Sequence, residues 1–178
     1  MTRRASLGAL LLLFATVASA QDTADETGRY VGHFVLDGSE EAARERIRRA
    51  LEPAIQSIPF LFRSMATERL NARFRVVRAI DIELPADRIS VRYTGERTRT
   101  LESRRGHPVT IETDDGGEAR MTQLFRDGHL EQVFEGEHGR MYRLLELSED
   151  GARMTATTIL QGGRLEQPIR ITQPYVRR

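Results

Sequence analysis

From residue 76 to near the end of the chain, apolar and polar residues alternate in short segments separated by turn residues. Ile80 and Ile82, for example, flank Asp81. A period of two places successive side chains on opposite faces of a β-strand, so each segment predicts a strand with one apolar face. The nine predicted strands cover residues 76–84, 89–94, 97–101, 107–113, 118–126, 129–135, 140–148, 153–160 and 164–175.

One further strand and two helices are predicted before this region. Residues 29–36 predict the first strand. Ser39 is a favourable N-cap, and the apolar residues that follow recur at three- and four-residue spacing, which predicts a helix. Pro53 should kink this helix or end it near Leu51. Proline is tolerated in a first helical turn, so Pro59 indicates the start of a second helix.

The connections between the predicted strands are too short for parallel pairing, which needs a crossover of about a dozen residues. Consecutive strands are therefore antiparallel neighbours. A meander of this length exposes its edges unless it closes, which favours a barrel; an open, curved sheet around the helices is the alternative. The predicted fold is mostly β with a helical insertion: an antiparallel meander barrel of about ten strands, with a two-helix lid at about residues 39–74. It forms a single domain over residues 29–178.

Alternation alone does not decide whether the apolar face points into the barrel or outward into lipid. A membrane barrel needs girdles of aromatic residues, whereas this chain has no Trp, 6% aromatic residues and a charged C-terminus. We therefore expect the apolar face to point inward, in a protein that is not integral to a membrane.

An apolar group, Phe60, Leu61 and Phe62, lies at the tip of the predicted lid. Helices that lie on membrane surfaces carry a cationic polar face, whereas the polar residues of this pair have mixed charge. We expect the apolar side of the second helix, which includes Phe62 and Met65, to pack against the sheet. Binding of the tip to a membrane surface is the alternative.

The first twenty residues have the parts of a secretory signal peptide: Arg3 and Arg4, an apolar run over residues 7–17, and the small residues Ala18-Ser19-Ala20. The apolar run is shorter than the roughly 20 residues that span a bilayer. Cleavage would leave a flexible arm at residues 21–28. The chain has no Cys for a disulfide or a lipid anchor. We expect a periplasmic or secreted protein, exported by general secretion or by the twin-arginine route.

Charge and motifs argue against several functions. The 27 basic residues, all Arg, nearly balance 26 acidic residues, which argues against binding to nucleic acid. The four His residues lack the spacing of metal ligands, and the chain has neither a glycine-rich phosphate loop nor the serine motifs of hydrolases. We expect no metal, no cofactor and no enzyme activity; a catalytic site built from residues distant in sequence is the alternative.

Polar residues interrupt the faces that we assign to the interior. An unpaired buried amide costs about 1–3 kcal/mol and an unpaired guanidinium costs more. These residues therefore indicate an interior that holds water or a ligand headgroup; exposure at strand ends, or reversal of a face by a bulge, is the alternative. The residues are Gln123, Gln132, Arg143, Gln167 and Gln173.

The order of elements resembles that of the calycin superfamily, and of fatty-acid-binding proteins in particular, in which a helix-turn-helix lid and nine strands follow the first strand. The resemblance covers residues 29–175. Lipocalins are less similar, because Gly28-Arg29-Tyr30 stands where they have a glycine-tryptophan pair. The resemblance implies that an arginine and a tyrosine of the final strand hold a ligand carboxylate. Tyr175 and Arg177 occur there in the opposite order.

We expect an exported protein that binds or carries a hydrophobic small molecule, lipid-like or fatty-acid-like, in the barrel lumen. Arg143, Tyr175 and Arg177 are the candidate headgroup ligands, because a guanidinium can pair with a carboxylate or phosphate through two parallel hydrogen bonds. The alternative is a periplasmic interaction module with a filled barrel, whose lid or edge strand binds an envelope protein.

Overall fold

The computed structural model describes residues 27–113, 116–137, 139–162, 165 and 167–178. The signal peptide and most of the predicted arm, residues 1–26, lie outside the described residues. The helices are α2 (Glu40–Gln56) and α3 (Phe60–Arg73). The strands are β1 (Gly32–Leu36), β2 (Val77–Glu83), β3 (Arg88–Gly95), β4 (Thr98–Arg104), β5 (Val109–Glu112), β6 (Glu118–Arg126), β7 (His129–Gly136), β8 (Gly139–Leu147), β9 (Arg153–Gln161) and β10 (Ile169–Arg177).

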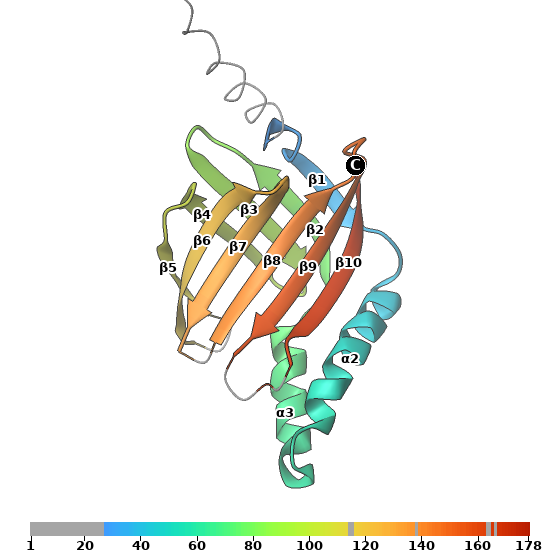
Figure 1. The fold of residues 1–178 in the computed structure, drawn as a ribbon. Helices are drawn as coiled ribbons and strands as arrows, with labels where there is room; N and C mark the ends of the chain where they lie inside the picture. Colours follow the sequence, from blue (N-terminus) through green and yellow to red (C-terminus); the bar gives the residue numbers. More distant parts are fainter. Residues whose placement is uncertain (1–26, 114–115, 138, 163–164, 166) are drawn as a thin grey trace, which may run out of the picture.

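The ten strands form one antiparallel sheet in the order β4-β3-β2-β1-β10-β9-β8-β7-β6-β5. The sheet curls into a nearly closed barrel, and the helices α2 and α3 extend from one end of it (Figure 1). The predicted barrel, with its helical insertion after the first strand, is confirmed. None of the helices in the described part of the chain is both long enough and apolar enough to cross a membrane.

The strand boundaries differ from the prediction mainly in β4, β5 and β10. β4 continues to Arg104, three residues beyond its predicted end, whereas β5 has only four residues. The final strand begins at Ile169 and not at residue 164. Pro168, directly before it, has no N–H to donate to a neighbouring strand, so pairing starts only after this residue.

Helix α2 begins as predicted but ends later. Ser39 is its N-cap and accepts a hydrogen bond from the Ala42 N–H at 3.2 Å. The prediction that the helix kinks or ends near Leu51 was wrong about the end, because α2 continues past Pro53 to Gln56. A proline in the last turn removes a single backbone donor. Ala54 and Ile55, which follow it, pack against the apolar cluster between the lid and the barrel and hold the last turn in place.

The apolar faces of the strands point inward, as expected. Their side chains form one cluster whose members are at most 7% exposed, so they fill the barrel interior closely. A wide water-filled lumen would leave such side chains in contact with solvent. The cluster contains Tyr30, Phe34, Ile80, Ile82, Ile89, Val91, Tyr93, Leu101, Met121, Leu130, Phe134, Leu145, Met154, Ala156 and Tyr175.

A second apolar cluster joins the lid to the barrel. Its buried members are Ala43, Ile47 and Leu51 of α2, Val76, and Ile169 and Ile171 of β10. Among the described side chains of α3 and the residue that follows it, Leu70 and Phe74 pack against this cluster.

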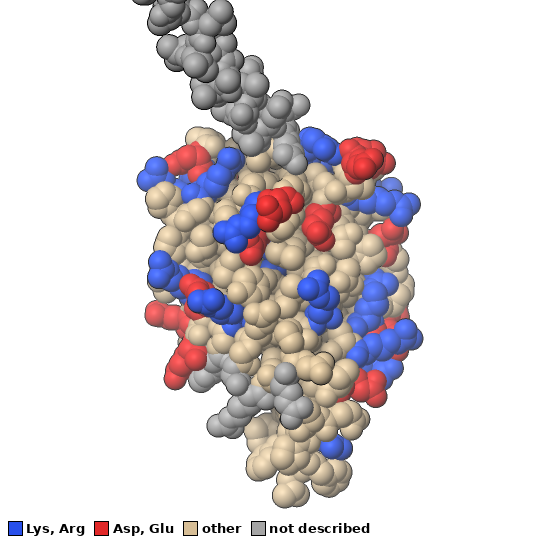
Figure 2. Space-filling view, in the orientation of Figure 1, with Lys and Arg blue, Asp and Glu red and all other residues tan. Residues whose placement is uncertain are grey.

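The first half of α3 does not pack against the sheet, contrary to expectation. Phe60 is 80% exposed, Leu61 84%, Phe62 56% and Met65 48%. Figure 2 shows the protruding end of the helix pair as a mainly uncharged surface. This half of the helix extends beyond the end of the barrel, so the sheet offers it no surface to cover (Figure 1).

Side chains close the barrel where the sheet has its two edges. β4 and β5 are these edges, and no ladder joins them in the described residues. Gln123 of β6 bridges the gap from the inside: its Nε2 donates to the Ile89 carbonyl at 3.0 Å and to Ser103 Oγ at 3.2 Å. Its Oε1 accepts from Gln132 Nε2 at 2.6 Å, and Gln132 Oε1 accepts from the Tyr93 hydroxyl at 2.5 Å. We call these four residues, Tyr93, Gln132, Gln123 and Ser103, the closure chain.

We predict that Gln123→Leu lowers the free energy of unfolding by about 1–3 kcal/mol, because it leaves the buried partners of the amide without hydrogen bonds. Urea unfolding followed by circular dichroism measures the change. Gln167→Leu is the matched control: Gln167 is exposed, so its substitution should change stability by no more than about 0.5 kcal/mol. Equal stability of Gln123→Leu and the wild type would contradict a role of Gln123 in closure.

Candidate functional site

An arginine of the barrel wall points into the apolar interior. Arg143 of β8 lies on the inward face with Leu145. Its guanidinium carbon is 4.3 Å from the centroid of the Tyr93 ring and 5.8 Å from that of the Phe134 ring. Attraction to the two aromatic faces compensates in part for the loss of water around the charge.

A second arginine reaches the same region from the lid. Arg46 of α2 donates from Nε to Gln173 Oε1 at 2.8 Å, and Gln173 Nε2 donates to the Ala43 carbonyl at 3.1 Å. The Arg46 Nη2 atom is buried and has no hydrogen-bond partner. Gln173 therefore fixes α2 to β10 and leaves one donor of the guanidinium free.

Two buried tyrosines lie near these arginines. The Tyr175 hydroxyl donates to the Val77 carbonyl at 3.1 Å, and the Tyr93 hydroxyl belongs to the closure chain. Burial raises the pKa of both tyrosines, and the positive charge of Arg143 opposes this increase in both. Arg46 also opposes the increase in the pKa of Tyr175. The charges of both arginines thus act on the Tyr175 hydroxyl.

Neither arginine is neutralised by a carboxylate in the described part of the chain. The ion pairs formed there, mostly on the surface, involve neither Arg46 nor Arg143. An arginine stays protonated at any pH at which the protein is folded. Two half-buried positive charges therefore border the apolar interior, with hydroxyl and amide groups beside them, and this arrangement is suited to bind an anion.

The buried glutamines have a structural role that the sequence did not reveal. Gln123 and Gln132 are directly opposite each other on β6 and β7 and are 0% exposed. The inference that they require water or a ligand headgroup was wrong, because the closure chain satisfies their amides. Gln173 is buried as expected, but its amide binds the lid. Gln167 is exposed in the bend before β10 and does not face the interior.

Arg177 is separate from the group formed by Arg46, Arg143 and Tyr175. Its guanidinium donates to the carbonyls of Gly151 at 2.9 Å, Val31 at 2.7 Å and Arg29 at 2.5 Å, and lies 4.6 Å from the centroid of the Phe34 ring. These contacts fix the end of the barrel opposite the lid (Figure 1). Of the predicted headgroup ligands, Tyr175 belongs to the interior cluster and Arg143 lies over Tyr93 of the same cluster, whereas Arg177 is bound at the far end of the barrel.

Sequence reasoning missed Arg46 and Tyr93 as members of the site. Arg46 lies three residues after Ala43 and four before Ala50, both in the apolar stripe of the helix. That spacing is a signal for an inward-pointing side chain. Tyr93 lies in the predicted strand 89–94, but nothing local indicates that an arginine of another strand covers its ring.

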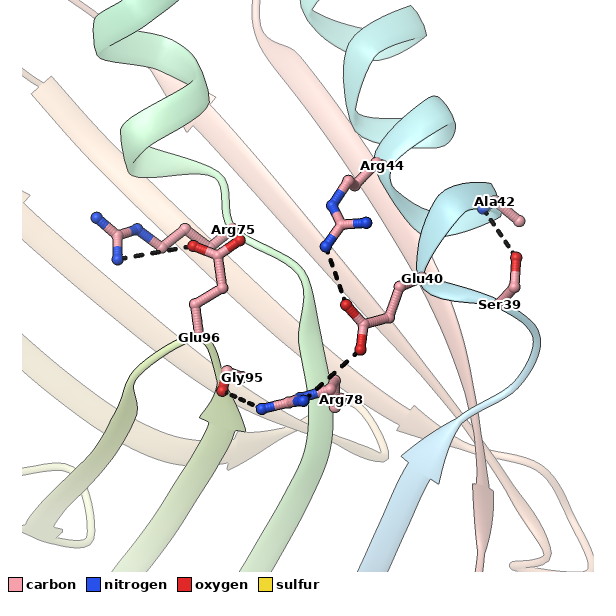
Figure 3. Close-up of polar contacts among 8 residues, drawn as sticks. All are labelled: Ser39, Glu40, Ala42, Arg44, Arg75, Arg78, Gly95 and Glu96. Atoms are coloured by element: carbon pink, nitrogen blue, oxygen red, sulfur yellow. Dashed lines mark hydrogen bonds and ion pairs between the residues drawn. The ribbon is translucent and has the colours of Figure 1, made fainter.

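A solvent-open groove of about 560 Å³ lies between α2, α3 and the turn from β3 to β4. Ile47, Phe74 and Val76 contribute apolar surface to it, and charged residues of α2 and the turn surround them. Figure 3 shows ion pairs between the helix ends and the barrel: Glu40 with Arg44 at 3.0 Å and Arg78 at 3.7 Å, and Arg75 with Glu96 at 3.9 Å. The ends of both helices are thus attached to the barrel, while the groove opens between them.

No group of three or more His, Asp or Glu side chains that could bind a metal ion occurs among the described residues. On the outer surface, the Asp81 carboxylate contacts His33 at 2.6 Å and Arg92 at 3.3 Å, and these three residues do not make a set of metal ligands.

Comparison with known structures identifies the fold. Lipid binding protein 8 of Caenorhabditis elegans superimposes with a TM-score of 0.56 at 13% identity, covering 85% of this chain and 96% of that protein. Fatty-acid-binding protein 1 of Echinococcus granulosus gives 0.55 at 14% identity, with 84% and 98% covered. The fatty-acid-binding protein from Drosophila melanogaster brain gives 0.52 at 17% identity, with 83% and 98% covered.

No protein-family model matches the chain, and no curated protein matches its sequence. At these low identities the likeness concerns the fold. The protein has the calycin-type barrel of fatty-acid-binding proteins, as the order of elements indicated. The names of the three similar proteins describe binding proteins and not enzymes.

We predict that the free energy of unfolding falls as the pH rises above about 10, the ordinary pKa of tyrosine. The raised pKa values keep Tyr93 and Tyr175 protonated in the folded state at a pH where the unfolded chain loses these protons. The chain has no Lys, so lysine titration does not obscure the effect. Urea unfolding between pH 9 and 11 measures it. Tyr93→Phe and Tyr175→Phe should each reduce the decline, whereas Tyr142→Phe, on the outward side of β8, should retain it. An unchanged decline in both buried variants would contradict the prediction.

Proposed function

We propose that the protein binds a small amphipathic anion, such as a fatty acid, with the headgroup beside Arg143 and Tyr175 inside the barrel. The observation that carries this proposal is the guanidinium of Arg143, which is half-buried, lies over the ring of the buried Tyr93 and has no carboxylate partner among the described residues. The fold supports it, because similar structures include proteins named for binding lipids or fatty acids.

A bound anion would stabilise the Arg143 guanidinium more than its contacts with the aromatic rings alone. A cation–π contact contributes about 0.5–2 kcal/mol, depending on how far the charge is desolvated. A hydrogen bond to a charged group contributes about 1.5–3 kcal/mol, and a carboxylate or phosphate can accept two from one guanidinium. A bound headgroup would therefore stabilise Arg143 more than Tyr93 and Phe134 do.

The tail of the ligand must displace side chains, because the interior is closely filled. Three methionines, Met121, Met141 and Met154, belong to or pack against the interior cluster. Methionine is unbranched and adopts many conformations at little cost, so these residues can rearrange around an alkyl chain. The groove between the two helices, which Ile47, Phe74 and Val76 line, is the proposed route of entry.

Residues 1–20 have the pattern of a signal peptide, and we propose that the protein acts outside the cytoplasm. N-terminal sequencing of the protein recovered from the periplasmic fraction of an expressing bacterium should read Gln21 as the first residue. Recovery of the protein only in the cytoplasm, with residues 1–20 still attached, would contradict export.

A second candidate function is a periplasmic interaction module that binds an envelope protein. The exposure of Phe60 and Leu61, at 80% and 84%, favours this candidate, as does the filled interior. Native mass spectrometry of protein purified from its own periplasm separates the two: a bound mass of a few hundred daltons supports the carrier, whereas ligand-free protein in complex with another protein supports the module.

The proposed headgroup site predicts a selective effect of Arg143→Gln. Calorimetric titration with decanoate, and with decanol as the neutral ligand of equal chain length, measures it. We expect the variant to bind decanoate at least about 10-fold more weakly, which corresponds to the lower end of one charged hydrogen bond, and to bind decanol as the wild type does.

Arg140→Gln is the matched control, because Arg140 lies on the same strand, is exposed and pairs with Glu135 on the surface. It should bind both ligands like the wild type. Absence of binding of both ligands by the wild type would contradict the carrier function. Equal loss of decanoate and decanol binding in Arg143→Gln would contradict headgroup recognition.

A further inference from the structure

We propose that Arg46 completes the headgroup site from the lid, so that a bound anion connects α2 to the barrel wall. This inference rests on the proposed function, and it adds a residue, and a consequence for the lid, to the site formed by Arg143 and Tyr175.

The hydrogen bonding of the Arg46 guanidinium is incomplete. Its Nε is held by Gln173 Oε1 at 2.8 Å, while Nη2 is buried without a partner. A buried donor left unpaired is destabilising, and more so on a charged group. The guanidinium is thus held in position with one N–H available, which is the arrangement expected of a ligand-binding donor before its ligand arrives.

Arg46 and Arg143 approach the Tyr175 region from two different elements. Arg46 comes from α2 and Arg143 from β8, and the charges of both act on the Tyr175 hydroxyl. Gln173, which holds Arg46, lies two residues from Tyr175 on the same face of β10. Two residues along a strand correspond to about 7 Å. One headgroup beside Tyr175 can therefore be reached from the lid and from the wall.

Arg46 differs from the other arginines of helix α2. Arg44 pairs with Glu40, and Arg48 and Arg49 pair with Glu45, all on the exposed side of α2. Their charges are balanced within the helix. Arg46 forms no ion pair with a carboxylate among the described residues, and its side chain extends to Gln173 of the barrel. The helix therefore presents one unbalanced charge to the interior.

This arrangement has a consequence for the lid. A headgroup bound by both arginines adds a bond between α2 and β8 that the ligand-free protein lacks, so an anionic ligand should reduce the opening of α2. A neutral ligand of equal length fills the same apolar space but offers no acceptor of comparable strength to Arg46. The lid should therefore respond to the charge of the ligand.

Hydrogen–deuterium exchange of the full chain tests this inference, read over the peptides that cover residues 40–56. Decanoate at saturation should slow exchange in α2 of the wild type at least about fivefold more than decanol does. In Arg46→Gln this difference should disappear, and decanoate should bind about 10-fold more weakly while decanol binds as before. Arg49→Gln, which removes an exposed arginine of the same helix, should behave like the wild type.

The possible failures can be distinguished. If the wild type binds neither ligand, the proposed function is wrong. If it binds decanoate through Arg143 but Arg46→Gln retains the affinity and the protection of α2, the inference about the lid is wrong and the proposed function stands. If Arg46→Gln does not fold, Arg46→Lys provides the comparison: it keeps the charge but loses the fork, and should bind decanoate several-fold more weakly with decanol unchanged. Unchanged decanoate affinity in Arg46→Lys would then overturn the inference.

Discussion

The closure chain that runs from Tyr93 through Gln132 and Gln123 to Ser103 holds opposite walls of the sheet together. A sheet of ten strands with one apolar face must curl to bury that face, but its edge strands β4 and β5 form no ladder among the described residues. Buried hydrogen bonds between side chains take over this role. Because each donor and acceptor is strong in a medium of low polarity, and costly when unpaired, the chain favours one closed arrangement over open ones.

The same chain positions the candidate site. Tyr93 is fixed by Gln132 at its hydroxyl and supports the guanidinium of Arg143 on its ring. Two kinds of polar group therefore coexist in the interior. The glutamines are satisfied by protein partners and serve the structure, whereas Arg143 and Arg46 retain unbalanced charge. Whether a buried polar group has a protein partner, and not burial itself, therefore distinguishes the structural groups from those available to a ligand.

The lid combines firm attachment with a free end. Ion pairs of Glu40 and Arg75 hold the ends of the helices that meet the barrel, and Gln173 holds the middle of α2. Beyond the barrel, the first half of α3 has no surface to cover and leaves Phe60 and Leu61 in solvent. Attachment near the interior keeps Arg46 in reach of the site, and the exposed end is available for other contacts.

The sequence alone determined the order of elements, the meander and the inward apolar face, because caps, turns and period-two alternation act between residues close in the chain. It also singled out Arg143, because this residue interrupts an apolar face, and Tyr175, through the resemblance to fatty-acid-binding proteins; their role as headgroup ligands stays a prediction. It did not determine which polar residues are satisfied: the pairing of Gln123 with Gln132, of Arg46 with Gln173 and of Arg177 with three carbonyls depends on strand register and on the docking of α2. Those contacts join residues up to 148 positions apart, and only the tertiary structure brings them together.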